Sequence, residues 1–600
     1  MYRNLKPLFP YLKKYRWTLF IGALTVFGNN GIWVLFPQIL RRAINDLDAH
    51  RSSPRSLAIY AGLLLAVAVT KGVFQYLTRW LVIGVSRDVE YDLRNDMFAH
   101  LERLPYSYYQ QNRTGDIMAR ATNDLNYVRM LMGPAIMYTA NTLVFTVAAL
   151  FFMWRTSPKL TVLAFLPLPL ASIVIQHFGR RIHERFEKVQ AQFSDISARA
   201  QENFSGARLI RAYVQEKPEI ELFETSNREY VARSLPLARL MGMLWPALEL
   251  LLGLAVAVVL WMGPREVLMR RMSVGDFYSF YTYLIMLTWP VIALGWVINV
   301  FQRGLASMGR INEILTVHPD INDSAVAEDL RHAETVRGTV EFRNLTFSYN
   351  GAAVLKNINL EIPAGTSLAI VGPTGSGKTT LVSLIPRIYD VQTREAKHNG
   401  MPSQGEIGAT GELLLDGRPL REYPLATLRR SIGFVPQETF LFSDTIRENI
   451  AFGVESATDE QIHSAAEAAN IATDIEAFPD QYNTMVGERG ITLSGGQKQR
   501  TAIARAIIRN PRILVLDDAL ASVDTHTEEK ILSHLREIMQ GRTTIFISHR
   551  VSTVRSADRI AVLHEGRVVE LGTHEELLER NGYYTELYNK QLLEEELAQV

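Results

Sequence analysis

Hydrophobic residues gather in the first half of the 600-residue chain, in long runs separated by charged segments. A helix that spans a bilayer needs roughly 20 consecutive apolar residues. Six runs approach that length, and the fourth is the shortest. A buried core helix could explain one such run but not six, so the pattern predicts six membrane-spanning helices. The runs cover Trp17–Leu40, Leu57–Gly84, Pro134–Trp154, Leu160–Ile175, Met241–Trp261 and Phe277–Val300.

The segments between these runs alternate between short and long. Both long segments, Val85–Gly133 and Gln176–Leu240, mix charged and apolar residues at helical spacing. Each is therefore expected to form a helical hairpin that continues out of the membrane. The expected hairpin helices are Arg87–Leu104, Gly115–Val128, His183–Asn203 and Ala207–Phe223.

The N-terminal segment Met1–Arg16 is basic and partly apolar, which is typical of a helix lying on the cytoplasmic face of a membrane. The apolar run after it is too long for a signal peptide, and no small-residue cleavage site follows. A cytoplasmic N-terminus places both long hairpins in the cytoplasm. The distribution of arginines supports this topology only in part, because several would lie outside.

A few polar residues interrupt the apolar runs, namely Asn29, Asn30, Lys71, Glu249 and Asn299. Charged groups inside a membrane are costly and usually face protein or water. Lys71 and Glu249 lie at similar depths, roughly 21 and 18 Å along their helices. One hypothesis is that they pair, within one chain or between two. The alternative is that each faces a water-filled cavity.

The second half of the chain has the composition of a soluble α/β domain. A polar segment precedes it, and its strands begin with Val340–Phe342 and Leu345–Tyr349. The predicted fold is an all-α transmembrane domain of six helices with long cytoplasmic extensions, followed by an α/β P-loop nucleotide-binding domain with a helical subdomain. The expected boundaries are 1–317 for the membrane domain, 318–338 for the linker and 339–600 for the nucleotide-binding domain.

One motif in the second half carries clear chemistry. Residues Gly372–Thr379 fit the pattern Gly-x-x-x-x-Gly-Lys-Ser/Thr at every fixed position. An apolar run, Ser367–Val371, reads as the strand before it, and Thr380–Ile388 reads as the helix after it. Such a loop turns backbone N–H groups toward phosphates. The expected ATP-binding residues are Gly372, Pro373, Thr374, Gly375, Ser376, Gly377, Lys378, Thr379 and Thr380.

Within this loop Lys378 can reach the β- and γ-phosphates of ATP, and the Thr379 hydroxyl can bind Mg²⁺. Because ATP is found in the cytoplasm, this motif also fixes the expected orientation of the chain. Charge and composition exclude some kinds of partner and site. A net charge of +1 gives no overall field that would attract nucleic acid. The absence of cysteine excludes disulfides, thiolate metal sites and a cysteine nucleophile.

From Tyr349 onward the chain resembles the ATP-binding cassette exporters, and the resemblance covers both halves. Besides the phosphate loop, five further motifs occur in the order and with the spacing of the family. They are Tyr349, Gln437 after Gly433–Pro436, the signature Leu493–Gln497, Asp517 with Asp524 after the apolar strand Ile513–Asp517, and His549 after the strand Thr544–Ile547.

The resemblance implies a role for each motif. Tyr349 would stack on adenine, Gln437 would contact Mg²⁺ and the attacking water, and Asp517 would bind Mg²⁺. His549 would donate a hydrogen bond to the γ-phosphate. The signature residues Ser494, Gly495, Gly496 and Gln497 would close over ATP held by an opposing cassette, so a dimer is implied. Glu488 and Arg489 resemble the segment that touches the hairpin tips.

The chain departs from the family pattern at Asp518, where active members carry glutamate as general base or water-positioner. Aspartate is one methylene shorter, and a misplacement of roughly 1 Å can lower a rate about 10²-fold. We therefore expect Asp518, Gln437 and His549 to form a site that binds ATP but hydrolyses it slowly. Since the signature is intact, the chain resembles one subunit of a heterodimeric exporter whose partner carries the glutamate. The alternatives are a homodimer with a slow base, and an ATP-gated regulatory or channel subunit.

A second departure is Val391–Thr410, expected to be a solvated surface loop. The overall prediction is a multi-pass protein of the cytoplasmic membrane that uses ATP and Mg²⁺ to export a hydrophobic drug, lipid or peptide. An importer is disfavoured, because spans and cassette share one chain in exporter order.

Overall fold

The structure is a computed structural model that describes residues 5–330, 336–349, 352–391, 407–487, 490, 492–519, 531, 539–548 and 550–599. The chain divides into two compact units. The helical unit comprises Met1–Ala99 and Ile117–Thr316. The two-sheet unit comprises His100–Asp116 and Val317–Val600. The tip of the first hairpin thus groups with the C-terminal half of the chain.

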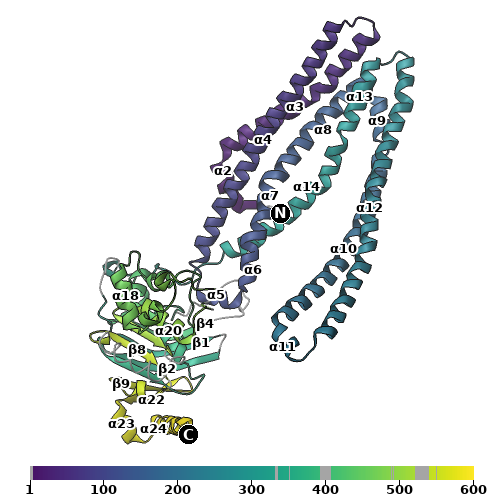
Figure 1. The fold of residues 1–600 in the computed structure, drawn as a ribbon. Helices are drawn as coiled ribbons and strands as arrows, with labels where there is room; N and C mark the ends of the chain where they lie inside the picture. Colours follow the sequence, from purple (N-terminus) through teal and green to yellow (C-terminus); the bar gives the residue numbers. More distant parts are fainter. Residues whose placement is uncertain are drawn as a thin grey trace. The chain divides into compact units, whose positions relative to one another are not determined.

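The helical unit is built from long helices that run side by side (Figure 1). Its short π-helical turns are Arg120–Asp124 and Leu131–Ala135. Its α-helices are α2 (Phe9–Lys14), α3 (Arg16–Asp48), α4 (Pro54–Leu101), α6 (Thr114–Ala119), α7 (Leu125–Met130), α8 (Ile136–Thr156), α9 (Pro158–Phe165), α10 (Leu168–Ser205), α11 (Ala207–Ala212), α12 (Glu216–Leu268), α13 (Val274–Met286) and α14 (Thr288–Leu315).

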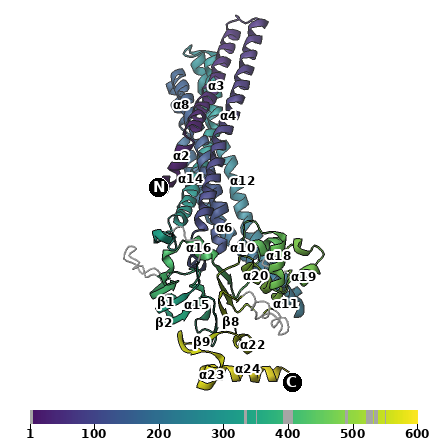
Figure 2. The ribbon, with the colours of Figure 1, turned by 90° about the vertical axis from the view of Figure 1, so that its left-hand side faces the viewer.

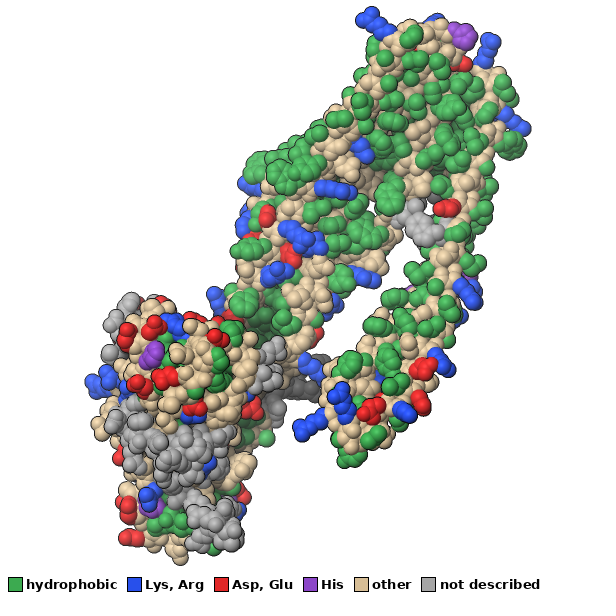
Figure 3. All heavy atoms as spheres, in the orientation of Figure 1, with side chains coloured by type: hydrophobic (Ala, Val, Ile, Leu, Met, Phe, Trp, Pro, Cys, Tyr) green, Lys and Arg blue, Asp and Glu red, His purple; other side chains and the backbone are tan. Residues whose placement is uncertain are grey.

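Five continuous helical stretches in the described chain are long and apolar enough to cross a membrane, and they carry five of the six predicted runs. They are Arg16–Asp48, Pro54–Leu101, Thr114–Thr156, Glu216–Leu268 and Val274–Leu315. Hydrophobic side chains cover the upper part of these helices in Figure 3, and charged side chains gather at their ends. Such a surface suits lipid rather than water.

The fourth predicted run is divided between two helices. Its first part lies in α9, whose N-cap Ser157 accepts a hydrogen bond from the N–H of Leu160, and its second part lies in α10. The break falls at Leu166 and Pro167. A proline inside a helix removes a hydrogen bond and clashes with the preceding turn, so a new helix starts after it.

The hairpin predictions need one correction. The predicted helix Ala207–Phe223 is interrupted, because α11 ends at Ala212 and α12 begins at Glu216. Val214 between them adopts a left-handed backbone conformation, with φ of 55°. That conformation is costly for a β-branched residue and cannot continue a right-handed helix.

The hypothesis that Lys71 pairs with Glu249 finds no support within this chain. In the described part of the chain no ion pair joins them, and Glu249 is exposed. The Lys71 ammonium instead lies 4.1 Å from the ring centroid of Trp33. Lys71 also lines a cavity, which agrees with the alternative hypothesis for this residue.

The two-sheet unit contains an antiparallel sheet of order β2-β1-β4-β5 and a six-stranded sheet of order β10-β9-β3-β8-β7-β6. The second is parallel except at β10. Figure 2 shows β1 and β2 on one side of this unit and α18–α20 on the other. The strands are β1 (Val340–Tyr349), β2 (Ala352–Ile362), β3 (Ser367–Val371), β4 (Ile407–Leu415), β5 (Arg418–Pro419), β6 (Ile432–Val435), β7 (Ile513–Asp517), β8 (Thr543–Ile547), β9 (Arg559–His564) and β10 (Arg567–Gly572).

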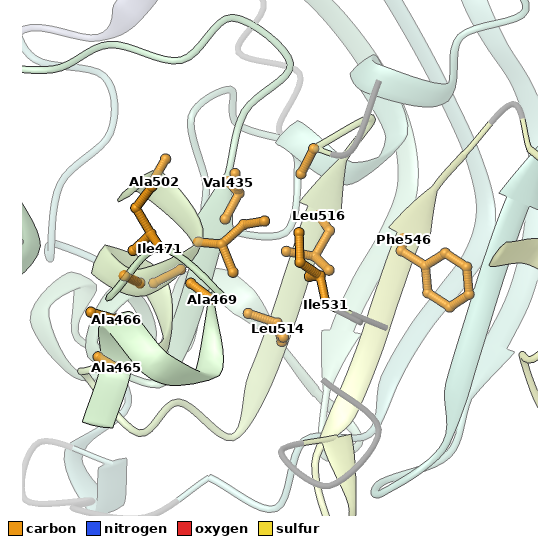
Figure 4. Packing of buried hydrophobic residues seen from close by; sticks show 14 of the residues in the cluster. Val435, Ala465, Ala466, Ala469, Ile471, Ala502, Leu514, Leu516, Ile531 and Phe546 are labelled. Atoms are coloured by element: carbon orange, nitrogen blue, oxygen red, sulfur yellow. The ribbon is translucent and has the colours of Figure 1, made fainter. Parts of the chain in front are cut away.

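Helices surround these sheets, and several form the predicted helical subdomain. They pack against the parallel strands, as Figure 4 shows for Leu514 and Leu516 of β7 beside small alanines of α18 and α20. The helices of this unit are α5 (Tyr106–Gln111), α15 (Lys378–Ser383), α16 (Leu425–Arg430), α17 (Ile446–Ala451), α18 (Asp459–Ala468), α19 (Ala472–Glu476), α20 (Gly495–Ile507), α22 (Val551–Val554), α23 (His574–Arg580) and α24 (Tyr583–Gln599).

Three predicted boundaries in this unit are wrong. The helix predicted over Thr380–Ile388 is α15, which ends at Ser383. The two N-terminal strands form one strand, β1, which bulges near Asn344, where φ is 48°. The loop predicted over Val391–Thr410 ends too late, because Ile407–Thr410 pair with β1 as the start of β4. Residues 392–406 of that loop lie outside the described residues.

The polar segment predicted as a linker packs on the two-sheet unit where it is described. The Asp323 carboxylate accepts a hydrogen bond from the Leu425 N–H at 2.9 Å. Asp329 forms an ion pair with Arg418 at 2.6 Å, and Val336 is buried. The domain boundaries predicted from the sequence stay predictions, since compactness alone divides the chain differently at the hairpin tip.

Candidate nucleotide-binding site

The phosphate loop follows β3, a strand whose five residues are all buried, as the sequence predicts. β3 lies between β9 and β8 near the middle of the parallel sheet. Gly372 leaves the strand with φ of 150°, and a Cβ there would lie 2.1 Å from the Leu563 carbonyl oxygen. Gly377 has a φ of 100°, and a Cβ there would lie 2.9 Å from the side chain of Leu355. Both positions therefore require glycine.

The side chain of Lys378 is buried under the loop. Its Nζ donates to the carbonyl oxygens of Gly372 at 2.8 Å and Pro373 at 2.9 Å. Burial lowers the pKa of Lys378, while the carboxylates of Asp518 and Asp517 act in the opposite direction. The charge is thus held close to the loop surface formed by the exposed residues Pro373–Gly375. A bound phosphate would replace neutral carbonyl partners with a charged one.

Ser376 adds a second indication that this loop accommodates a ligand. Its hydroxyl oxygen is buried and has no hydrogen-bond partner in the structure. Buried polar atoms without partners are rare in folded proteins and often mark a site completed by a ligand or water. The loop residues therefore fit a nucleotide phosphate.

Asp517 ends β7 and is buried beside the loop. The Thr379 hydroxyl donates to its Oδ1 at 3.1 Å. Burial raises the pKa of Asp517 to about 6, and the neighbouring charge of Asp518 also raises it. The hydrogen bond from Thr379 and the charge of Lys378 lower this pKa. The described residues hold no cluster of three or more acidic, histidine or cysteine ligands. One carboxylate and one hydroxyl nevertheless fit Mg²⁺, which usually takes few protein ligands and completes its shell with phosphates and water.

Asp518, the residue that departs from the family pattern, follows directly. Its N–H donates to the carbonyl of Ile547 at 3.1 Å, and its φ is 48°. A left-handed conformation is uncommon outside glycine, asparagine and aspartate, and at functional sites it fixes where a side chain points. Strand pairing of Asp517 with Ile547 holds this backbone in place.

Tyr349, the expected adenine platform, lies at the end of β1 within an aromatic cluster. Its ring centroid is 5.3 Å from that of Tyr389, which in turn lies 6.1 Å from that of Tyr106 in α5. Burial raises the pKa of Tyr389. The neighbouring Tyr349 raises it further, and a hydrogen bond with Gln110 lowers it slightly. The first hairpin tip thus contacts the ATP-binding half through Tyr106 and Tyr389, whereas the contact expected at Glu488 and Arg489 is not tested.

Tyr389 has no counterpart among the residues expected from the sequence. It follows the phosphate-loop helix and carries no motif of its own. Only the folded chain shows that it joins the expected adenine platform to α5.

The signature residues lie in the helical subdomain and begin α20. Ser494 is the N-cap, and its hydroxyl accepts a hydrogen bond from the Gln497 N–H in a capping box. Gln497 also donates to Asp474 of α19 at 3.1 Å. The described hydrogen bonds of this segment stay within the subdomain, and none reaches the phosphate loop. Gly495 and Ser494 remain exposed, so another molecule can reach this helix terminus.

Of the remaining expected site residues, the structure describes only Gln437. Gln437 follows β6 and is exposed, at the same edge of the parallel sheet as Asp517. Ligands of open parallel sheets bind at this carboxyl edge. His549, Asp524, Glu488 and Arg489 lie outside the described residues.

Two family models match the chain. Residues 19–291 match the model described as "ABC transporter transmembrane region", and residues 355–521 match the model described as "ABC transporter". The chain is 36% identical to the probable multidrug resistance ABC transporter ATP-binding/permease protein YheI of Bacillus subtilis, over 99% of this chain and 98% of the relative. This chain belongs to the ABC transporters.

Other similar ABC transporters carry different names. An ATP-dependent lipid A-core flippase of Syntrophus aciditrophicus is 36% identical, over 94% of this chain and 90% of that protein. The multidrug resistance-like ATP-binding protein MdlA of Escherichia coli is 33% identical, over 96% and 95%. A solved bacterial Atm1-family ABC exporter with ATP bound superposes with a TM-score of 0.78 and 28% identity, covering 96% of this chain and 99% of that one.

The predicted fold is therefore confirmed as that of an ABC exporter, with a helical transmembrane domain followed by an α/β nucleotide-binding domain. The chain is an ATP-binding, ATPase-coupled transporter. It is a multi-pass protein of the inner membrane, with its nucleotide-binding domain in the cytoplasm.

Proposed function

We propose that this ABC exporter is one half of a heterodimer, and that the ATP site built on its own phosphate loop is degenerate. In this proposal Lys378 and the loop N–H groups hold the phosphates, Thr379, Asp517 and Gln437 hold Mg²⁺, and Tyr349 holds adenine. Asp518 is a short, slow base. The signature Ser494–Gln497 completes a fully active site on the partner, whose own chain carries glutamate.

The identity of Asp518 supports this proposal most directly. Its backbone is tied to β8 through Ile547, so the side chain cannot move forward to replace the missing methylene. Hydrolysis is mainly positioning and charge stabilisation around in-line attack. A carboxylate displaced by roughly 1 Å costs about 10²-fold. The capping box of Ser494 and Gln497 is intact, which suits a signature that still serves another site.

The substrate class in this proposal is inferred from the names of the similar proteins. The similar proteins are named for multidrug resistance and for flipping of lipid A-core. We infer that the chain exports a hydrophobic drug, lipid or peptide. ATP binding would favour one arrangement of the helices and hydrolysis would reset it, because a ligand shifts only equilibria in which it binds the two states differently.

The decisive experiment compares ATP turnover in four preparations: the purified chain alone, the chain with a similar subunit that carries glutamate at the corresponding position, and both of these with Asp518→Glu in this chain. The proposal predicts slow turnover alone, fast turnover in the mixture, and a gain of about 10²-fold from Asp518→Glu in the lone chain. Brisk turnover by the lone chain, unchanged by the substitution, would show a homodimer with a competent aspartate.

An ATP-gated regulatory or channel subunit is the second candidate, and the same Asp518 favours it. Uphill transport into inside-out vesicles separates the two. A regulator would bind ATP without concentrating any solute, whereas the exporter concentrates solute only with ATP and Mg²⁺.

A further inference from the structure

A cavity of about 360 Å³ lies in the helical unit, among α3, α4, α8, α13 and α14. Its volume is that of a small-molecule pocket. The lining combines cationic side chains, side-chain amides and aromatic rings, and no described lining residue is acidic. A pocket inside a membrane-spanning region with positive charge and no negative charge is unusual, because uncompensated charge there is costly.

Lys71 carries the more enclosed of the two charges. It is half-buried, and its Nζ lies 4.1 Å from the Trp33 ring centroid. No ion pair or hydrogen bond joins it to another described residue of this chain. A cation–π contact offsets only part of the cost of placing a lysine inside a membrane-spanning helix. The ring alone leaves the ammonium short of compensation, and an anion in the cavity would supply it.

Hydrogen bonds hold the asparagine side chains of the cavity lining in place. The Asn141 Oδ1 accepts hydrogen bonds from Asn30 Nδ2 at 2.8 Å and from Asn29 Nδ2 at 3.4 Å. Asn141 Nδ2 donates to the carbonyl of Met137 at 2.9 Å. The Oδ1 of Asn29 is buried and has no partner. The cavity therefore offers a ligand the cation of Lys71, which suits an acidic head group.

The rest of the lining suits an apolar body. Gln75 and Arg79 follow Lys71 at helical spacing along α4, so Arg79 stands about 12 Å further along the same face. Arg79 is exposed at the cavity edge. The remaining lining is largely aromatic and aliphatic, and it includes Tyr138 of α8 and Trp289 of α14.

We propose that this cavity binds an anionic amphiphile, with a phosphate monoester or carboxylate head at Lys71 and an apolar body along Trp33 and Trp289. The inference rests on the proposed export function only for its role in transport. Binding is measured without ATP and without a partner subunit, so the two ideas fail separately.

The test is equilibrium binding to the full chain in neutral-lipid nanodiscs. The probes share one pyrene-labelled dodecyl chain and end in phosphate, carboxylate, hydroxyl or trimethylammonium. We expect the two acids to bind about tenfold more tightly than the other two, because a charged acceptor makes a stronger hydrogen bond to the ammonium than a neutral one. Lys71→Met should remove that preference and Lys71→Arg should keep it. Lys13→Met, a matched change at an exposed lysine of α2, should leave it unchanged.

Equal binding of the four probes, or an unchanged preference in a folded Lys71→Met variant, would overturn the proposal. Thermal melting checks that the variant is folded. Competition identifies the source of the ligand: displacement by phosphatidic acid in the disc indicates a membrane lipid, and displacement only by short soluble acids indicates a cytoplasmic solute. If the acids bind but ATP turnover with the partner subunit ignores them and no solute is moved, the binding site stands and the export function falls.

Discussion

The two units of this transporter reveal their chemistry in different ways. In the two-sheet unit, residues adjacent in the sequence build the site, since Gly372, Lys378 and Thr379 belong to one loop and meet Asp517 across one strand. In the helical unit, the cavity around Lys71 draws on five helices spread over most of the unit. Local motifs therefore identify the ATP site, whereas the cavity is visible only in the folded chain. This difference predicts that single substitutions in the ATP site strongly reduce its function. Single substitutions in the helical unit should have smaller effects.

The largest effect is expected from Lys378→Ala. Removing the buried ammonium takes away a donor that stabilises charge on the transferring phosphate, and the loss of one such donor costs about 10²–10³-fold in turnover. The ATP turnover of the lone chain, which can use only this phosphate loop, measures the loss. Lys217→Ala, at an exposed position of α12, is the control. Equal rates for the two variants would show that this loop does not handle phosphate.

Asp518→Glu comes next, with an expected gain of about 10²-fold in the turnover of the lone chain. Asp518→Asn should remove the remaining turnover while ATP still binds. The two substitutions together separate the length of the side chain from its charge. A glutamate variant no faster than the native chain would contradict the degenerate-site account.

A smaller effect follows from the pKa of about 6 at Asp517. The carboxylate binds Mg²⁺ only when ionised, so affinity for Mg²⁺-ATP should fall as pH drops through 6. Between pH 7 and pH 5 the ionised fraction falls about tenfold. Titration with a fluorescent ATP analogue measures the change. Asp517→Asn should bind weakly at both values, and an equal fall in both proteins would assign the pH effect to other groups.

The smallest effect concerns the helical unit. Ser157 caps α9 after the break from α8, and its replacement by alanine should cost about 1 kcal/mol of stability. Thermal unfolding in detergent measures the loss. Ser157→Asn keeps a capping oxygen and should restore the native midpoint. A loss as large as that of a core substitution would mean that single changes in this unit are not milder.

The sequence predicts best where one segment decides the outcome. In Ser367–Val371 one serine is followed by four apolar residues, and burial on both faces makes the segment a strand of the parallel sheet. The phosphate loop follows from fixed spacing. The contact of Tyr389 with Tyr106 joins residues distant in the chain, and no local pattern marks it.

The wrong predictions have physical reasons of the same kind. Apolar content alone treats Leu160–Ile175 as one run, although Pro167 divides it. Val214 carries no turn signal, yet it adopts the conformation that ends α11. Ile407–Thr410 look like loop because Gly408 lies among them, but pairing with β1 extends them. Tertiary packing decides each of these segments.

The central claim is that ATP is retained on this subunit while its partner's site turns over. The direct measurement loads the complex of this chain and a glutamate-bearing subunit with labelled ATP and Mg²⁺, removes free nucleotide, and follows how much intact ATP remains over many turnovers. The account predicts that about one ATP for each complex stays unhydrolysed, and that Asp518→Glu abolishes this fraction. Conversion of all bound ATP to ADP at a single rate, the same in both proteins, would contradict it.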